Sequence, residues 1–290
     1  MPQETLDLLQ RGVAANKADK FRRGNVIYLP LETSLIATGD LHGYRRNFER
    51  IAAFADLKSN PDRHVVLQEI IHGGPVDTEG GCLSYHLLFE AVRYKLAFPD
   101  RVHIIMGNHD TACISNGRVM KDGKEMNRSM REALCREFKN DAAEVEQAIR
   151  EFLLSEPLAI RTENKIWLSH SLPSDRFLNK FDPKVLEMPL EVGDTVKPGS
   201  TSSPQGSSAY LLTWGRNMSQ QTLDRMAELL DVDLFILGHQ PQEEGWIQAG
   251  RNLVIIASDH SHGCLLPIDI SKAYTIEELI ESVVPLASIP

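Results

Sequence analysis

Five short, largely apolar runs in this chain are each followed closely by a side chain that can bind a metal ion. The runs cover residues 35–37, 65–67, 102–106, 166–168 and 234–237. The side chains that follow them are Asp40 with His42, Glu69, Asn108, His170 and His239. Apolar runs that alternate with helical segments are typical of buried parallel strands. Because open α/β folds gather their ligands at the carboxyl ends of such strands, five repeats predict one shared site at the edge of a sheet.

The first run leads into Asp40 and His42, which are two residues apart and flanked by Gly39 and Gly43. Side chains alternate faces along a strand, so this spacing lets the carboxylate and the imidazole point the same way. A carboxylate oxygen beside an imidazole nitrogen suits a divalent transition metal. The glycines let the backbone turn sharply and pass close to an ion or a substrate. Such a pair also occurs on solvated loops, and its recurrence at four other strands favours the metal interpretation.

Length and charge limit the classes of protein to which this chain can belong. Its 290 residues, of which 42% are hydrophobic, can bury a sizeable core, and we expect one domain over 1–290. The formal net charge of −9 and the lack of a basic block argue against a nucleic-acid partner, because phosphates are neutralised by lysine and arginine. We therefore expect the substrate to be held by metal ions and a few cationic side chains. The oligomeric state stays open.

Cysteine usage and hydropathy indicate the compartment. The four cysteines are widely spaced without a C-x-x-C pair, and they are Cys82, Cys113, Cys135 and Cys264. No disulfide framework is expected from this spacing, and the N-terminus has charges where a signal peptide would need an apolar stretch. No apolar run approaches the ~20 residues needed to span a bilayer. We therefore expect a soluble, cytoplasmic protein without a membrane partner.

Hydrophobic periodicity predicts an α/β protein whose core covers about residues 25–270. Strands alternate with helical patterns as far as residue 106, and a mostly polar helical insertion is expected over about 112–157. Short strands are then expected at 158–160, 166–168, 234–237, 253–257 and 264–268. A Gly/Ser/Pro stretch over 198–208 predicts a surface loop, and the residues from 273 onward predict an outer helix.

The ligand types expected at the shared edge suit a site with two metal ions. Two cations with a carboxylate between them can clamp an in-line displacement at phosphorus, with a metal-bound water as the nucleophile. The leaving oxygen then needs a proton, and the imidazole of His109, next to Asn108, is the expected donor. We expect Asp77 to orient that imidazole and keep it cationic. The alternative is that Asp77 caps a turn.

Four short motifs surround the expected ligands. They are Gly39-Asp40-Leu41-His42-Gly43, Gly107-Asn108-His109-Asp110, His170 after Trp167-Leu168-Ser169, and Gly238-His239-Gln240-Pro241. Their order and spacing resemble the metal motifs of the calcineurin-like metallophosphoesterases, and are most similar to the phosphoprotein phosphatase branch. The resemblance covers about residues 35–270. It implies a two-sheet α/β (α+β) sandwich flanked by helices, with a dinuclear metal centre at its loop edge.

One motif of that family is altered in this chain. The family has Gly-Asp-x-x-Asp-Arg-Gly, whose first Asp bridges the two metals, whereas this chain has His-Gly-Gly-Pro-Val-Asp-Thr-Glu over 72–79. Aligned without a gap, Gly74 replaces the bridging Asp and Thr78 replaces the phosphate-binding arginine. We favour an alignment in which Glu69 is the bridge, because cations without a central anion would repel one another strongly. The alternative is that the bridge is lost.

The resemblance also assigns roles to single residues. The implied ligands are Asp40, His42 and His239 for one metal, Asn108 and His170 for the other, and Glu69 as the bridge. Arg216 lies where the family carries a phosphate-binding arginine, and a guanidinium suits phosphate because it can bind in a bidentate fashion. Asn108 and Arg216 are therefore the expected contacts to the substrate's phosphate. The alternative is that Arg216 has a surface role.

The function implied by the resemblance is a metal-dependent phosphomonoester hydrolase similar to serine/threonine protein phosphatases. Mixed nitrogen and oxygen ligation fits manganese or iron, and also zinc, better than calcium. The substrate would be a phosphoprotein or a small phosphoester. One alternative is a dinucleoside polyphosphate hydrolase with the same centre. A second alternative is a catalytically degenerate relative that binds a phosphorylated ligand, which the missing arginine at Thr78 would favour.

Overall fold

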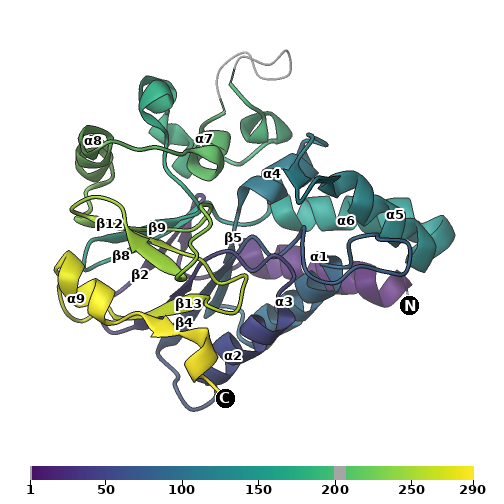
Figure 1. Ribbon diagram of the computed structural model, residues 1–290, viewed down its shortest axis with the longest axis horizontal. Coiled ribbons are helices and arrows are strands. Elements are labelled where there is room, and N and C mark those ends of the chain that lie inside the picture. The colour runs from purple at the N-terminus through teal and green to yellow at the C-terminus, as the bar shows by residue number, and fades with distance from the viewer. Residues whose placement is uncertain (1, 199–206) are drawn as a thin grey trace.

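The computed structural model describes residues 2–198 and 207–290 as two β-sheets packed face to face and covered by helices (Figure 1). Within this described part, one sheet has five strands, the other has seven, and a two-stranded hairpin lies apart from both. The predicted α/β sandwich flanked by helices is therefore confirmed.

The five-stranded sheet carries the first three strands of the expected site. Its order is β14, β13, β3, β4, β5, and β3, β4 and β5 run parallel to one another. The bounds are β3 Ser34–Thr38, β4 Arg63–Gln68, β5 Val102–Ile105, β13 Cys264–Asp269 and β14 Val284–Pro285. Because the three strands are parallel, their carboxyl ends lie at the same edge.

The seven-stranded sheet carries the other two strands of the site. Its order is β1, β2, β8, β9, β10, β12, β11, and β9, β10 and β12 are parallel. The bounds are β1 Arg22–Arg23, β2 Val26–Leu29, β8 Ala159–Thr162, β9 Ile166–Ser169, β10 Leu234–Leu237, β11 Trp246–Gln248 and β12 Leu253–Ile256. The pattern of apolar runs predicted one sheet edge, whereas the five strands divide between two facing sheets, as the family resemblance implied.

Alternate residues along the strands build two apolar cores. Leu35 and Ala37 of β3 pack with Ile236 of β10, so they fill the space between the sheets. Ile36, between them, belongs to the core under the helices, as does Phe235 in β10. This period of two is the strand pattern expected when both faces are buried. The shared inner core keeps the sheets face to face, and the carboxyl ends of both sets of strands meet.

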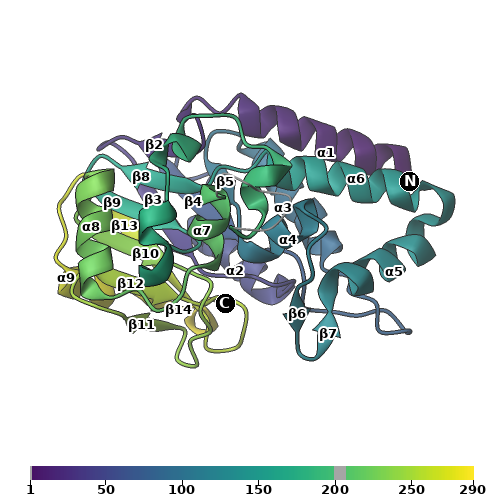
Figure 2. The same cartoon turned by 90° about the horizontal axis from the view of Figure 1, so that it is seen from above.

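Helices cover the outer faces of the sheets. The described helices are α1 Pro2–Lys17, α2 Arg45–Ala55, α3 Tyr85–Ala97, α4 Asn108–Ile114, α5 Met126–Phe138, α6 Ala142–Leu154, α7 Ser208–Trp214, α8 Gln220–Leu230 and α9 Ile276–Glu281. Helix α1 packs against α3 and α6, and Figure 2 shows α1 and α6 side by side. Helix α2 packs on β4 and α3 on β5. No helix in the described ranges is both long and apolar enough to cross a bilayer.

The segment expected as a helical insertion is interrupted. A hairpin of β6 Met120–Lys121 and β7 Lys124–Glu125 separates α4 from α5.

Short 3-10 turns connect several of the elements. They are η1 Lys139–Asp141, η2 Asp175–Lys180, η3 Pro183–Leu186, η4 Val192–Thr195 and η5 Leu286–Ser288. The loop predicted over 198–208 lies mostly outside the described residues, and Ser208 already starts α7. The predicted C-terminal helix is short, because the chain returns as β14 to the edge of the five-stranded sheet.

Candidate metal centre

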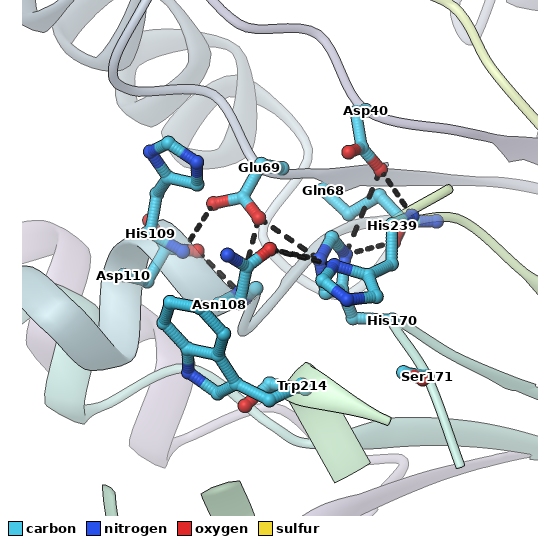
Figure 3. Close-up of polar contacts among 12 residues, drawn as sticks. Asp40, Gln68, Glu69, Asn108, His109, Asp110, His170, Ser171, Trp214 and His239 are labelled. Atoms are coloured by element: carbon cyan, nitrogen blue, oxygen red, sulfur yellow. Dashed lines mark hydrogen bonds and ion pairs between the residues drawn. The ribbon is translucent and has the colours of Figure 1, made fainter. Parts of the chain in front are cut away.

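The predicted ligands converge where the carboxyl ends of the two sheets meet. Figure 3 shows Asp40, Glu69, Asn108, His170 and His239 directed towards one another. The backbone of Asp40 forms isolated parallel bridges to residues on both sides, one following β12 and one at the end of β4. Asp40 therefore lies at the junction between the sheets, where ligands from both can reach it.

Glu69 is fully buried beneath the start of α4. The backbone N–H of Asn108 donates to its Oε2 (3.0 Å) and the N–H of His109 donates to its Oε1 (2.9 Å). Gly107 permits this approach, because a Cβ there would lie 2.6 Å from Glu69 Oε2. A carboxylate at a helix N-terminus satisfies free N–H groups and interacts favourably with the helix dipole. These contacts fix Glu69 among the other ligands.

Gln68 determines which nitrogen of His170 is available. The amide nitrogen of Gln68 donates to the Thr38 carbonyl (2.6 Å), which turns its Oε1 towards His170 Nδ1 (2.8 Å). Nδ1 must therefore carry the hydrogen, and Nε2 is left for another partner. Nε2 lies 2.9 Å from Glu69 Oε2 and 2.9 Å from Asn108 Oδ1. This arrangement is attractive only if a cation, either a proton or a metal ion, is shared with those oxygens.

His42 and His239 present nitrogens to the same place. The Ile71 carbonyl accepts from Nδ1 of His42 (3.0 Å), so the unprotonated Nε2 faces Asp40 Oδ2 at 3.6 Å. The backbone N–H of His239 donates to Asp40 Oδ1 (2.8 Å). Nε2 of His239 is buried and has no hydrogen-bond partner in the described part of the chain. A hydrogen bond from the other ring nitrogen to a carbonyl, as His42 makes to Ile71, commonly fixes the tautomer of a metal-binding histidine.

Electrostatics also favour a cation at this site. Burial would raise the pKa of the Asp40 carboxyl, but the His170 and His42 rings outweigh it and lower this pKa. Burial would lower the pKa of His170, but the Asp40 and Glu69 carboxylates raise it above its ordinary value. Burial lowers the pKa of His239 well below its ordinary value, and the His170 ring adds to this effect. The Asp40 carboxylate thus stays charged and draws positive charge towards the centre.

The residues present fit a transition-metal centre. One ligand atom each from Asp40, Glu69 and His170 lies within 4.8 Å of the others. Asn108 Oδ1 is also 2.8 Å from Nδ1 of His239. Imidazole nitrogens, carboxylate oxygens and an amide oxygen together suit manganese, iron or zinc. The structure therefore brings together all six side chains that the sequence selected as ligands.

A pocket of about 250 Å³ opens beside these side chains. Its lining includes six of the predicted site residues and several others, and the full set is Asp40, His42, Asn108, His109, Met120, Lys121, Asp122, Arg216, His239, Gln240, Pro241, Ala257 and Asp259. Nη2 of Arg216 donates to the His239 carbonyl (3.3 Å). Arg216 therefore lies beside the metal ligands, where the sequence expected a contact to phosphate.

His109 lines this pocket, but its neighbour differs from the one predicted. Its Nδ1 lies 3.1 Å from Nδ1 of His72, so one ring donates and the other accepts. Burial lowers the pKa of His109 well below its ordinary value, and the nearby His42 and His72 rings lower it further. Burial also lowers the pKa of His72, to about 3. His109 thus lies in an environment that favours the neutral imidazole.

The prediction that Asp77 orients His109 is wrong. The Asp77 carboxylate accepts from Nε of Arg136 in α5 (2.7 Å) and from the backbone N–H groups of Glu79 and Gly81. Its pKa is lowered, chiefly by the hydrogen bond from Arg136. The physical reason is that the loop after β4 turns this carboxylate towards α5. Asp77 caps a turn, which was the alternative interpretation.

The altered motif can now be described position by position. Glu69 lies among the ligands, whereas Gly74 packs against the backbone of Gly43, with the place of a Cβ only 2.5 Å from the Gly43 carbonyl oxygen. Thr78 is not among the residues that line the pocket. The geometry therefore supports the alignment that gives Glu69 the central position, and the bridging role itself stays a proposal.

Two residues of the site were not selected from the sequence. Neither Gln68 nor His72 is among the site residues predicted from the sequence. Gln68 is the last residue of β4, which is a sequence signal for a side chain at the sheet edge. His72 has a positive φ of 66°, which only the tertiary structure reveals. Gln68 contacts His170, and His72 contacts His109.

Comparison with known proteins was made at the level of families and of individual relatives. A family model described as calcineurin-like phosphoesterase matches residues 33–243 of this chain. Serine/threonine-protein phosphatase C23G10.1 of Caenorhabditis elegans is 26% identical over 235 residues, which are 76% of this chain and 46% of that protein. The chain thus spans about half the length of this curated relative.

Solved structures resemble this chain in fold. One is a protein serine/threonine phosphatase from Saccharomyces cerevisiae with similarity to human phosphatase PP5, with a TM-score of 0.66, 11% identity, and coverage of 99% of this chain and 93% of that chain. Another is the cold-active protein-tyrosine phosphatase of a psychrophilic Shewanella species, with a TM-score of 0.55, 14% identity, and coverage of 86% and 82%. At these identities the similarity concerns the fold alone.

Proposed function

We propose that this chain, which belongs to the calcineurin-like phosphoesterase family, is a metal-dependent hydrolase of phosphate monoesters that acts as a serine/threonine protein phosphatase does. The relative from Caenorhabditis elegans has that activity in its name, which supports this choice within the family. A reducing compartment such as the cytoplasm is part of the proposal, because the four cysteines are free thiols.

One observation carries the proposal. Nε2 of His42 faces the Asp40 carboxylate and Nε2 of His170 faces that of Glu69, while Nε2 of His239 is buried without a hydrogen-bond partner among the described residues. Three of these side chains, Asp40, His42 and His239, line a pocket. In an ordinary protein core such atoms would be paired with donors or replaced by apolar groups. The cluster is costly unless cations complete it, and a pocket beside it gives a substrate access.

In this proposal the ligands serve two ions. We assign Asp40, His42 and His239 to one ion and Asn108 with His170 to the other, with Glu69 between them. When bound, two ions of manganese, iron or zinc supply Lewis acidity that activates water and neutralises the charge developing at phosphorus. The protein's part is to hold the ligands in fixed tautomers, which it does through Gln68 for His170 and through the Ile71 carbonyl for His42.

Substrate phosphate would be oriented by Asn108 and Arg216. Nη2 of Arg216 already donates to the His239 carbonyl, which holds the guanidinium beside the ligands and leaves other N–H groups for a phosphate oxygen. No carboxylate within the described residues forms an ion pair with Arg216. Its charge is therefore available to the substrate.

His109 is the proposed proton donor to the leaving oxygen, and His72 is its partner in place of Asp77. Its lowered pKa makes it neutral in the free pocket. A phosphate dianion beside the ring would raise this pKa, because a negative neighbour favours the protonated imidazole. Protonation of His109 is then coupled to the presence of substrate.

The proposal is tested by elemental analysis of metal content together with hydrolysis of an aryl phosphate in the presence of manganese. The wild type, Glu69→Ala and the exposed-residue control Glu144→Ala are compared. We expect two metals per chain and manganese-stimulated turnover in the wild type and control, with both lost in Glu69→Ala. One metal or none in the wild type, together with no turnover, would overturn the proposal.

A panel of substrates then distinguishes the alternatives. Phosphoserine and phosphothreonine peptides are compared with dinucleoside polyphosphates under the same conditions. Preference for the dinucleotides would replace the protein phosphatase by a nucleotide hydrolase with the same centre. Two bound metals without turnover of any substrate would favour a relative that only binds a phosphorylated ligand.

A further inference from the structure

The β6–β7 hairpin places a second cation in the pocket of the metal centre. Lys121, at the end of β6, lines the same pocket as Asp40, His109 and Arg216. In Figure 2 the hairpin lies beside α5, across from β10 and β12. Lys121 is neither a proposed metal ligand nor the proposed proton donor, so its position in the pocket needs another explanation.

The hairpin is built to hold its position. Its turn is an Asp-Gly pair, and both Asp122 (φ 50°) and Gly123 (φ 76°) have the positive φ of a tight two-residue hairpin loop. At its base, the buried Asn127 side chain donates to the carbonyls of Ala112 (3.0 Å) and Gly117 (2.6 Å). Ala112 belongs to α4, the helix that begins with Asn108 and His109. The hairpin is therefore fixed to the helix that carries the site.

Lys121 forms a weak ion pair with Asp259. Nζ of Lys121 lies 3.4 Å from Oδ2 of Asp259, and the two side chains are 26% and 24% exposed. Asp259 follows β12 and lines the same pocket, so the pair joins the hairpin to the seven-stranded sheet across the pocket. A single, partly exposed ion pair at this distance contributes little to stability. Lys121 can thus change partners at little cost.

Besides Arg216, Lys121 offers a positively charged side chain to a phosphate group in this pocket. The arginine of the family's motif would fall on Thr78 in the ungapped alignment, and Thr78 does not line the pocket. Among the residues that do line it, Lys121 and Arg216 are the lysine and arginine side chains. An ammonium group offers three donors and binds phosphate as a point charge.

We propose that Lys121 binds the phosphate of the substrate and that it exchanges Asp259 for that phosphate. The inference rests on the proposed function for its substrate and adds a residue that determines phosphate affinity. In the free protein Asp259 holds the ammonium in the pocket. When a phosphate enters, Lys121 turns to it and the Asp259 carboxylate returns to water.

Two substitutions then have opposite effects on phosphate affinity. Lys121→Met removes the charge while keeping most of the aliphatic stem, and it should weaken binding about 10- to 100-fold, as expected for a charged hydrogen bond. Asp259→Asn removes the competing carboxylate, and it should strengthen binding about 2- to 5-fold, the range of a partly exposed ion pair. In the double variant the gain from Asp259→Asn should be lost, because it acts through Lys121.

The experiment is a calorimetric titration of inorganic phosphate into manganese-loaded protein. Lys124→Met is the matched control, because Lys124 lies on the same hairpin, is exposed, does not line the pocket, and has its ammonium 3.5 Å from the Gly80 carbonyl. We expect wild-type affinity in this control. Equal phosphate affinity in the wild type and Lys121→Met, or no phosphate binding by the wild type, would overturn the inference.

Turnover is measured separately, so that the two proposals can fail independently. With an aryl phosphate, Lys121→Met should raise KM and the inhibition constant of phosphate by similar factors while metal content stays unchanged. If the wild type shows no turnover but binds phosphate in a way that depends on Lys121, the hydrolase proposal fails and the inference stands. If turnover is normal and Lys121→Met leaves KM and phosphate inhibition unchanged, the inference fails and the hydrolase proposal stands.

Discussion

The two ends of strands β4 and β5 both carry buried histidines, but only one end forms a site. At the amino ends lie His64 and His103, and just beyond the carboxyl ends lie Glu69 and Asn108 with His109. Both ends combine imidazoles with a buried carboxylate. They differ in how those groups are paired and in whether a pocket reaches them.

The amino end is a closed end, because its buried polar side chains contact one another. Nδ1 of His103 lies 3.0 Å from Oδ2 of Asp19, and its Nε2 lies 3.0 Å from Nδ1 of His64. The two rings are stacked at 7° between their planes. The buried Lys95 ammonium is 3.7 Å from Asp19 and donates to two backbone carbonyls. Each ring thus has a polar neighbour and the lysine balances the carboxylate.

The carboxyl end leaves nitrogen lone pairs facing oxygens. Nε2 of His170 faces two of them, and Nε2 of His239 has no partner among the described residues. The pocket of about 250 Å³ opens on this end. The comparison shows that buried histidine and carboxylate side chains do not by themselves indicate a metal centre. What marks the site is the pocket that reaches it, together with the two oxygens that face Nε2 of His170.

The largest expected effect is on turnover, which should depend on the carboxyl end of β4 and β5 and not on the amino end. His109→Ala at the carboxyl end should lower kcat by about 10²- to 10⁴-fold, the usual contribution of a general acid. Metal content should be unchanged, because His109 is not a proposed ligand. His103→Asn at the amino end should leave kcat unchanged when it is assayed below its unfolding temperature. Steady-state kinetics check both, and full turnover in His109→Ala would remove it from the mechanism.

The next largest effect is on the free energy of unfolding, to which the buried pair at the amino end should contribute. Asp19→Asn leaves the buried Lys95 without its carboxylate and should lower the free energy of unfolding by about 3 kcal/mol, as expected for a broken buried pair. Urea denaturation measures this change. Asp7→Asn on the exposed face of α1 is the control and should stay within about 0.5 kcal/mol of the wild type. If Asp19→Asn changed kcat instead of stability, the amino end would not be merely structural.

Metal binding at the carboxyl end should stabilise the folded protein, and this stabilisation should not depend on Asp19 at the amino end. Manganese at about 100 times its dissociation constant should raise the free energy of unfolding by about 2.7 kcal/mol, because it binds the folded state. His170→Ala should abolish this increment, and Asp19→Asn should keep it. Thermal unfolding with and without manganese tests the difference. An increment that survives His170→Ala would place the ion elsewhere.

The smallest expected effect is a pH dependence from the closed end. Burial lowers the pKa of His64 to about 3, and the neighbouring His103 adds to this effect. The unfolded chain binds a proton at His64 below about pH 6.5, whereas the folded protein does so only near pH 3. This contribution to stability is therefore complete above pH 6.5 and is lost as the pH falls, by at most about 1.4 kcal/mol per pH unit.

The measurement compares wild type and His64→Asn in metal-free buffer at pH 7 and pH 5. The loss of stability between the two values should be smaller in the variant, because one histidine no longer resists protonation. His86→Gln, at a partly exposed ring paired with Glu137, provides the control. An equal loss in wild type and His64→Asn would show that the closed end does not titrate as described.

Much of the fold and site could be predicted because the signals are local. An apolar run specifies a strand, and the residue just past it must emerge at the sheet edge, whatever the rest of the chain does. This reasoning placed Asp40, Asn108 and His239 correctly. It also favoured Glu69 over Gly74, because Glu69 is the residue that directly follows β4.

The roles of loop residues could not be predicted in the same way. Asp77 follows the ligands by only a few positions, yet Arg136, far along the chain, takes its carboxylate. His72 reached His109 through a backbone conformation with positive φ. The pair of Lys121 and Asp259 joins residues 138 positions apart. No local pattern reports which of these loops will meet.

The sequence by itself determined the strands, the ligand types and the family of the chain, since each depends on a short stretch of residues. Only the tertiary structure decided which imidazoles are paired and which face a pocket. The physical reason is that hydrogen-bond partners are chosen by distance and not by position in the sequence. The same combination of carboxylate and histidine therefore became a closed core contact at one end of β4 and β5 and a candidate metal centre at the other.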